Sequence, residues 1–376
     1  MLFHVSRKSS VIPFLNTIIT IQSLLFRSQT LALTTNTCTG TNTGIDTCST
    51  ILQMSSSASA SSSSNQPPNK VIDSHLHVWA DENESTEYPY EANQTPPSNL
   101  INISSTQSLL QQLEKNNVDG TLIVQPINHK YDHTYVLNAI KSHPNKFKGM
   151  LLFDPSFQDS DLALRYLEDL VLKGFVGVRF NPYLWPENDE NDKELKMSTG
   201  SGLDVYKRCG ELNIPVGIMC FKGLNLHYRD IVNLLEKSKE TTMILDHFGF
   251  TRLANDDAAN DAAVNADDDN FQLLLSLQKY ENVIIKISAL FRIANDVDKY
   301  PFDKVKKERF DVLLNTFGKD RLMFGTDFPF VALEEGGYQG AINTVKSWTN
   351  EDIDVQNAIM YGTAERLFGV WGGVKK

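Results

Sequence analysis

Short apolar runs alternate with amphipathic segments from residue 71 to the end of the chain. Eight runs are rich in aliphatic residues and follow turn signals, a pattern that predicts buried parallel strands. They span residues 71–78, 120–126, 148–153, 175–181, 214–220, 242–247, 283–289 and 321–328. Segments with helical spacing cover 105–116, 134–142, 161–173, 202–212, 230–237, 271–280, 302–317 and 355–368. Eight strands, each followed by a helix, predict an α/β fold: a single-domain (β/α)8 barrel of the TIM type.

Two polar stretches interrupt this alternation. One covers residues 187–202 after the fourth strand, and the other covers 255–270 after the sixth. The second stretch holds six Asp and no basic residue. Such a composition cannot bury apolar surface, so we expect it to be a solvated, partly disordered insertion.

The first 70 residues differ from the rest of the chain. They are dense in Ser, Thr and Asn, and Asp46 is their only acidic residue. The apolar stretch 11–26 is short and interrupted by polar residues, so no stable membrane span is expected there. We predict that residues 1–70 are a targeting peptide with a Ser-rich disordered linker, and that 71–376 form the barrel. Import into an organelle, plastid or mitochondrion, is favoured, with the secretory pathway and the cytoplasm as alternatives.

The charge and cysteine content narrow the range of partners. A formal net charge of -11 at pH 7 gives a surface that repels phosphate backbones, so no nucleic-acid partner is expected. Four cysteines are too few for a disulfide scaffold in a chain of 376 residues. The sequence does not indicate an oligomeric state.

Chemically active residues end several of the predicted strands. In a barrel these carboxyl ends form the working face. The first strand contains Asp-Ser-His75-Leu-His77, and the alternation of side chains points both imidazoles to one side. The sixth strand ends in His247, and the eighth carries Asp327 before a proline. A carboxylate that faces three imidazoles can act as a general base toward water, so we predict these four residues to be catalytic.

Three arginines lie near the same face. Arg179 ends the fourth strand, Arg252 follows the sixth, and Arg292 follows the seventh. Guanidinium groups bind carboxylates through paired hydrogen bonds, which predicts a small anionic substrate. Any one of these arginines could instead pair with a carboxylate of the protein. Gln125, at the end of the second strand, is a further candidate for substrate binding.

Taken together, these motifs resemble the amidohydrolase superfamily. The set comprises Asp-x-His-x-His-x-Trp, Leu-Asp-His-x-Gly and Gly-Thr-Asp-x-Pro, and the likeness covers residue 71 to the C-terminus. It is most similar to the amidohydrolase-related branch, which includes 2-pyrone-4,6-dicarboxylate lactonase and fuconolactonase. The resemblance implies that His75 and His77 surround the attacked carbonyl with Asp327, that Asp327 is the base toward water, and that His247 lies beside them.

The chain departs from the two-metal members of that superfamily. Those members need a bridging Lys or Glu on the fourth strand and a His on the fifth, whereas here the fourth ends in Arg179 and the fifth in Met219-Cys220-Phe221. A guanidinium cannot bridge two cations, so a binuclear centre is not expected. Two cases stay open. Either one divalent cation, zinc or manganese, is held by His75, His77 and Asp327, or no metal is required. We favour metal-independent or weakly metal-dependent chemistry.

These features predict a hydrolase that cleaves a lactone or other ester-type C–O bond of a small carboxylated or sugar-derived substrate. One alternative is a metal-dependent decarboxylase of the same superfamily. The other is a barrel that binds a carboxylate without catalysis. A binding protein has no need of a general base, so the histidines and the aspartate favour an enzyme.

Overall fold

The computed structural model describes residues 70–185, 196–254 and 262–372. The predicted targeting peptide, at 1–69, and most of the polar stretch 187–202 lie outside these ranges, so the leader and the boundary at residue 70 stay predictions. No helix in the described ranges is long and apolar enough to cross a membrane.

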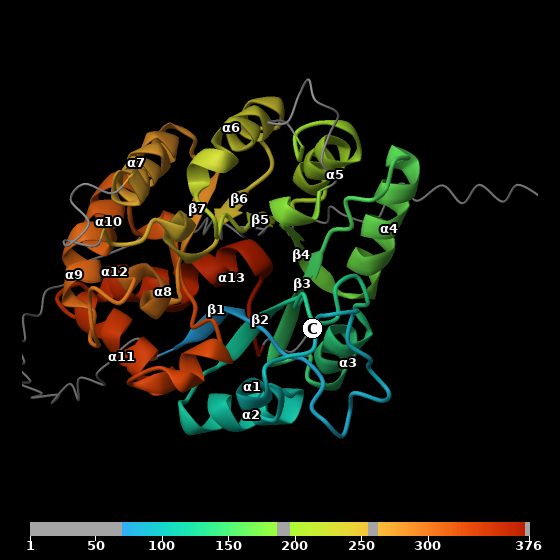
Figure 1. Cartoon of the computed structure of the whole chain (residues 1–376), viewed down its shortest axis with the longest axis horizontal. Coiled ribbons are helices and arrows are strands. Elements are labelled where there is room, and N and C mark those ends of the chain that lie inside the picture. The colour runs from blue at the N-terminus through green and yellow to red at the C-terminus, as the bar shows by residue number, and fades with distance from the viewer. Residues whose placement is uncertain (1–69, 186–195, 255–261, 373–376) are drawn as a thin grey trace, which may run out of the picture. The chain divides into compact units, whose positions relative to one another are not determined.

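The predicted (β/α)8 barrel is confirmed. One sheet contains eight parallel strands that neighbour each other in chain order, with helices around them (Figure 1). The strands are β1 (Ile72–Leu76), β2 (Gly120–Val124), β3 (Phe147–Leu152), β4 (Phe175–Phe180), β5 (Val216–Ile218), β6 (Met243–Leu245), β7 (Val283–Ile287) and β8 (Leu322–Phe324). Most predicted strands are longer than the observed ones, and the predicted catalytic residues His77, His247 and Asp327 lie beyond the last residue of β1, β6 and β8.

The helices follow the predicted alternation, with several differences. They are α1 (Ser98–Ile101), α2 (Thr106–Lys115), α3 (Thr134–Ser142), α4 (Ser160–Lys173), α5 (Gly200–Glu211), α6 (Tyr228–Lys237), α7 (Ala262–Ser276), α8 (Leu290–Ala294), α9 (Asp303–Val305), α10 (Asp311–Phe317), α11 (Gly337–Trp348), α12 (Ile353–Asn357) and α13 (Thr363–Phe368). The pattern did not predict α1, α8 or α11. Short π-helical turns join α9 to α10 and α12 to α13, so each of these predicted helices is continuous.

The expectation of an insertion over residues 255–270 is wrong from residue 262 onward, where α7 begins. Alanine favours the helical backbone, and three alanines lie in the first five residues of α7. The acidic composition of this stretch therefore did not exclude a helix. Residues 255–261 lie outside the described part of the chain.

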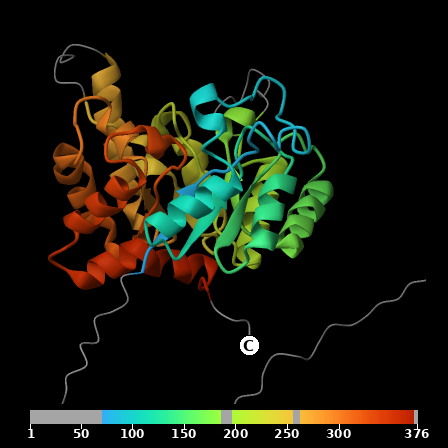
Figure 2. The same cartoon turned by 90° about the horizontal axis from the view of Figure 1, so that it is seen from below.

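One end of the barrel interior is filled by apolar side chains. Inward-facing residues from several strands form a buried cluster, which includes Ile72, Met150, Ile244, Ile284 and Met323. Phe368 and Trp371, from the C-terminal segment, pack against this cluster. Figure 2 shows that segment, in red, running along one edge of the barrel. The closed end leaves the carboxyl ends of the strands as the open face.

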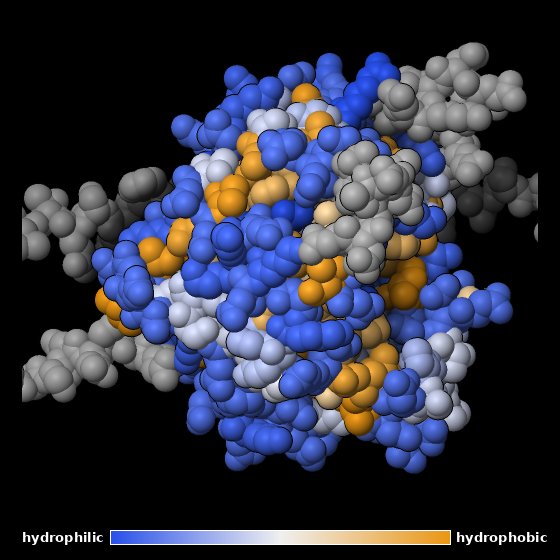
Figure 3. All heavy atoms as spheres, turned by 60° about the vertical axis from the view of Figure 1, so that its left-hand side comes forward, coloured by the Kyte–Doolittle hydropathy of each residue, from blue (hydrophilic) through white to orange (hydrophobic). Residues whose placement is uncertain are grey.

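The surface of the barrel is mainly polar where Figure 3 displays it. Hydrophobic residues on that face stand in small separate groups among hydrophilic ones. Small groups of this kind are ordinary on soluble proteins. The hydrophobic groups on this face therefore do not indicate a binding surface for another protein.

Backbone hydrogen bonds between β1 and the segment after β8 close the barrel. The Asp327 amide donates to the His75 carbonyl at 2.8 Å, and the His77 amide donates to the Phe328 carbonyl at 2.7 Å. The buried Asp73 carboxylate reinforces this seam, because it accepts hydrogen bonds from Thr326 and from the Tyr338 hydroxyl. Closure of the barrel therefore brings its first and last strands together at the open face.

Gly325→Ala should weaken this closure. A Cβ at this position would lie 2.8 Å from the Cβ and 2.9 Å from the backbone nitrogen of His75, and a backbone atom cannot move aside. We expect a loss of about 1–3 kcal/mol in the free energy of unfolding, measured by urea denaturation. Gly217→Ala in β5 is the control, because its nearest neighbour, at 3.2 Å, is the flexible Met150 side chain. Equal losses in the two variants would contradict a special constraint at the seam.

Candidate active site

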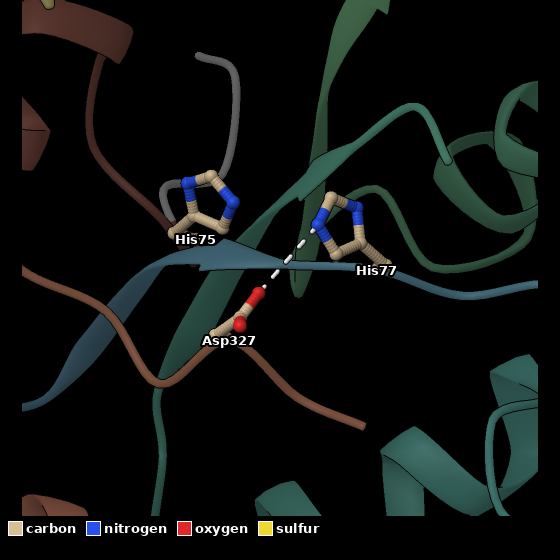
Figure 4. Close-up of side chains that lie close together, drawn as sticks. All are labelled: His75, His77 and Asp327. Carbon is tan, nitrogen blue, oxygen red and sulfur yellow. Dashed lines mark ion pairs between the residues drawn. The ribbon is translucent and has the colours of Figure 1, made fainter. Parts of the chain in front are cut away.

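The structure brings the four predicted catalytic residues together at the open face. Figure 4 shows His75 on β1, His77 just beyond the end of that strand, and Asp327 on the segment that follows β8. The Asp327 Oδ1 atom lies 3.7 Å from His77 Nε2 and 3.9 Å from His247 Nε2. The His75 and His247 ring centres are 4.3 Å apart. Residues separated by about 250 positions thus surround one small volume.

Asp327 is a buried carboxyl group with one direct cationic partner. Its Oδ2 atom accepts a hydrogen bond from Arg292 Nε at 2.8 Å. Burial raises the pKa of Asp327 to about 6, and the guanidinium of Arg292 limits the rise. The group is therefore a carboxylate near neutral pH but a stronger base than an exposed aspartate. A base of this strength is suited to taking a proton from water.

Hydrogen bonding fixes the tautomer of His77. Its Nδ1 atom lies 2.8 Å from the carbonyl oxygen of Val124, which can only accept, so Nδ1 carries the proton. The Nε2 lone pair then faces the Asp327 carboxylate across 3.7 Å. Burial holds the pKa of His77 well below its usual range, so the ring is neutral. Two acceptors that face each other require a proton, a water molecule or a cation between them.

His247 is also neutral, and it lies at a turn of the backbone. Burial holds its pKa well below the usual range, and its Nδ1 atom lies 2.8 Å from the Ser288 hydroxyl oxygen. His247 and Asp327 both have positive φ, 50° and 66°. Non-glycine residues rarely adopt this conformation, which costs about 1–3 kcal/mol and occurs mostly at functional sites.

Beneath this site lies a network of buried charges that sequence reasoning missed. Asp246 is fully buried, and its oxygens lie 3.1 Å from His75 Nδ1, 3.2 Å from Arg179 Nη2 and 3.4 Å from Lys286 Nζ. Burial opposes ionisation of Asp246, but these neighbours hold its pKa well below the usual range. Burial and the charge of Lys286 lower the pKa of His75 to about 3. A signal was present in the sequence, since lysine is rarely fully buried and Lys286 interrupts an apolar strand.

The residues also fit a single divalent cation. His75, His77 and Asp327 each offer one ligand atom, and these atoms lie within 4.8 Å of one another. The His75 Nε2 atom is buried and has no hydrogen-bond partner within the described ranges. A buried polar atom without a partner is costly, which indicates that something else binds there. His247 is not part of this group of three.

A pocket of about 470 Å³ opens beside these residues. All four predicted substrate-binding residues line it: Gln125, Arg179, Arg252 and Arg292. Aromatic side chains complete the wall, namely Trp79, Phe221, Phe250, Phe291 and Phe330. His77, His247 and Asp327 also line the pocket, whereas His75 is fully buried behind them.

The four substrate-binding candidates differ in their availability to a ligand. Arg179 is ion-paired with Asp246, and Arg292 with Asp327, which is the internal pairing that the sequence left open. The amide nitrogen of Gln125 donates to two backbone carbonyls of the following loop. Arg252 donates to the Phe221 carbonyl, a neutral group. Among the described contacts, Arg252 is therefore the arginine whose charge is not paired with a carboxylate.

Comparison with known proteins connects this site to a family. The amidohydrolase family model matches residues 72–370. No curated protein sequence matches the chain.

Several solved structures share the barrel. A probable 2-pyrone-4,6-dicarboxylic acid hydrolase from Acinetobacter baumannii, with citric acid bound, is 21% identical with a TM-score of 0.59, over 80% of this chain and 100% of its own. An amidohydrolase from Burkholderia multivorans with bound zinc is 18% identical with a TM-score of 0.58, over 80% and 99%. A 2,6-dihydroxybenzoate decarboxylase, complexed with 2,6-dihydroxybenzoate, is 15% identical with a TM-score of 0.52, over 80% and 99%. At these identities the likeness establishes the fold.

Proposed function

We propose that this chain, which belongs to the amidohydrolase family, is a hydrolase that cleaves a lactone or similar ester bond of a small carboxylated substrate. The observation that carries the proposal is the position of Asp327. Its carboxylate faces two neutral imidazoles at 3.7 and 3.9 Å and lies on the wall of a pocket that arginines also line. A general base beside an anion-binding pocket is what ester hydrolysis requires.

The side chains at the site have separate roles in the proposed hydrolysis. Asp327 accepts a proton from a water molecule as the water oxygen attacks the ester carbonyl carbon. The oxyanion that forms lies in a pocket with Arg179 and Arg292, whose positive charges stabilise it. Breaking the C–O bond releases an alkoxide, which takes the proton from Asp327 and restores the carboxylate. His77 and His247 orient the water, because their neutral rings lie beside the carboxylate.

A divalent cation would supply Lewis-acid polarisation of the carbonyl if it is bound. His75, His77 and Asp327 would hold it, as their mutual distances and the unpartnered His75 Nε2 indicate. The steps assigned above to the side chains do not depend on it.

The substrate class follows from the pocket wall. The cationic groups at the pocket favour a carboxylate, and the aromatic side chains favour a flat or ring-shaped body. The hydrolase from Acinetobacter baumannii, which has the same fold, binds citric acid, a carboxylated molecule, and this supports the proposal. A carboxylated lactone has a carboxylate for the cationic groups and a ring for the aromatic side chains.

Asp327→Asn should abolish turnover but preserve binding. Asparagine keeps the shape of the side chain and can still accept from Arg292, but it cannot take a proton from water. We expect kcat to fall by about 100-fold to 10,000-fold, measured with a panel of carboxylated lactones, while calorimetry shows unchanged affinity for the product acid. Glu334→Gln, an exposed carboxylate on the same segment, is the control and should keep its rate. No turnover in the wild type, together with tight product binding, would instead indicate a non-catalytic binding barrel.

Arg252→Met should weaken recognition of the carboxylate. The guanidinium lines the pocket and has no described carboxylate partner, so its charge is available to the substrate. We expect KM for a carboxylated lactone to rise about tenfold to a hundredfold, as for the loss of a charged hydrogen bond worth about 1.5–3 kcal/mol. The methyl ester of the same substrate is the matched control, and its KM should not change. An equal rise for both compounds would show that Arg252 acts through packing.

Metal-dependent decarboxylation is the second candidate. The observation that favours it is the group of three residues that can hold a cation, on a fold that a decarboxylase shares. We expect lactone hydrolysis to keep most of its rate after dialysis against a chelator. Loss of all activity on chelation, recovery with zinc, and release of CO₂ from an aromatic carboxylate would favour the decarboxylase.

A further inference from the structure

Lys286 is a fully buried lysine that the proposed reaction does not use. It lies on β7, where Ile284 two residues before it also faces the barrel interior, as does Ser288 just after the strand. Its ammonium group has two described partners, His75 Nδ1 at 3.1 Å and Asp246 Oδ1 at 3.4 Å. Burying an ammonium group costs desolvation free energy, so a fully buried lysine indicates a specific structural or functional role.

A hydrogen-bond acceptor and a hydrogen-bond donor both contact the same atom of His75. Asp246 Oδ1 and Lys286 Nζ both lie 3.1 Å from His75 Nδ1. A carboxylate can only accept a hydrogen bond and an ammonium can only donate one. A proton on Nδ1 therefore satisfies Asp246 but faces the ammonium, while a lone pair on Nδ1 satisfies Lys286 but faces the carboxylate.

The presence or absence of a proton on Nδ1 determines whether Nε2, the other ring nitrogen, carries a lone pair or a proton. With the proton on Nδ1, the Nε2 lone pair is free to bind a metal ion, in the carboxylate–histidine–metal arrangement common in metalloproteins. With the lone pair on Nδ1, the proton moves to Nε2, which can then donate to a substrate oxygen but cannot bind a metal. His75 Nε2 has no hydrogen-bond partner among the residues that the structure describes, so it is open to either use.

We propose that Lys286 is a positioning residue that competes with Asp246 for His75 Nδ1 and thereby weakens divalent-metal binding at His75, His77 and Asp327. Lys286 favours the Nε2–H form of His75 and Asp246 favours the metal-binding form. The positive charge of Lys286 acts in the same direction, because it repels a cation close to His75. The inference requires only that the three residues can bind zinc. It does not depend on the substrate or on hydrolysis.

Zinc affinity of the metal-free protein tests the competition. Lys286→Met removes the donor, keeps the length of the side chain and removes a buried charge. We expect this variant to bind zinc at least about tenfold more tightly than the wild type, in equilibrium competition with a chromophoric chelator. Asp246→Asn should change affinity in the opposite direction, by about tenfold to a hundredfold. Ile284→Met, at the neighbouring inward-facing position of β7, is the matched control and should leave the affinity unchanged.

The tautomer of His75 provides a second readout, and its measurement in the wild type needs no substitution that could fail to fold. Nitrogen NMR of histidine-labelled, metal-free wild type separates the two neutral forms by which ring nitrogen carries the proton. We expect the Nε2–H form in the wild type and the Nδ1–H form in Lys286→Met. The Nδ1–H form in the wild type overturns the proposal. Unchanged or weaker zinc binding in a folded Lys286→Met protein also overturns it. Neither readout involves turnover, so neither is affected if the proposed hydrolysis proves wrong.

Discussion

Pairing between the first strand and the segment after the last strand is the constraint on which the site depends. The hydrogen bonds of His75 with Asp327, and of His77 with Phe328, close the barrel and also set the distance between two histidines and the base. A glycine at position 325 allows the close approach, because any side chain there would meet the His75 backbone. The same backbone contacts that stabilise the fold therefore also position the chemistry.

The second feature that governs the site is its balance of buried charge. Arg179, Lys286 and Arg292 lie among the carboxylates of Asp246 and Asp327, and all of these groups except the partly exposed Arg292 are buried. Burial and the nearby cations keep His75, His77 and His247 neutral, which leaves lone pairs and N–H groups available for a substrate or an ion. Charge that would be screened at the surface acts strongly here, since both carboxylates and Lys286 are buried.

Membership of the amidohydrolase family does not by itself identify the reaction. Proteins with this fold include a hydrolase and a decarboxylase, and a fold supports several chemistries through its loops. Arg179 and Lys286 are cations beside the place where a metal ion would bind. The positive charges of Arg179 and Lys286 oppose tight binding of a metal ion. They therefore favour a site that relies on a carboxylate base and arginines.

The sequence by itself determined the barrel, because eight apolar runs that alternate with amphipathic segments have few other ways to bury their surface. It also predicted that His75, His77, His247 and Asp327 lie close together, since residues at the carboxyl ends of barrel strands must share one face. It missed α1, α8, α11, the start of α7 and the buried ion pair of Lys286 with Asp246. Only the tertiary structure decided which charges meet, because ion pairs such as Lys286 with Asp246 join neighbouring strands through side chains, and no local pattern encodes the register between them.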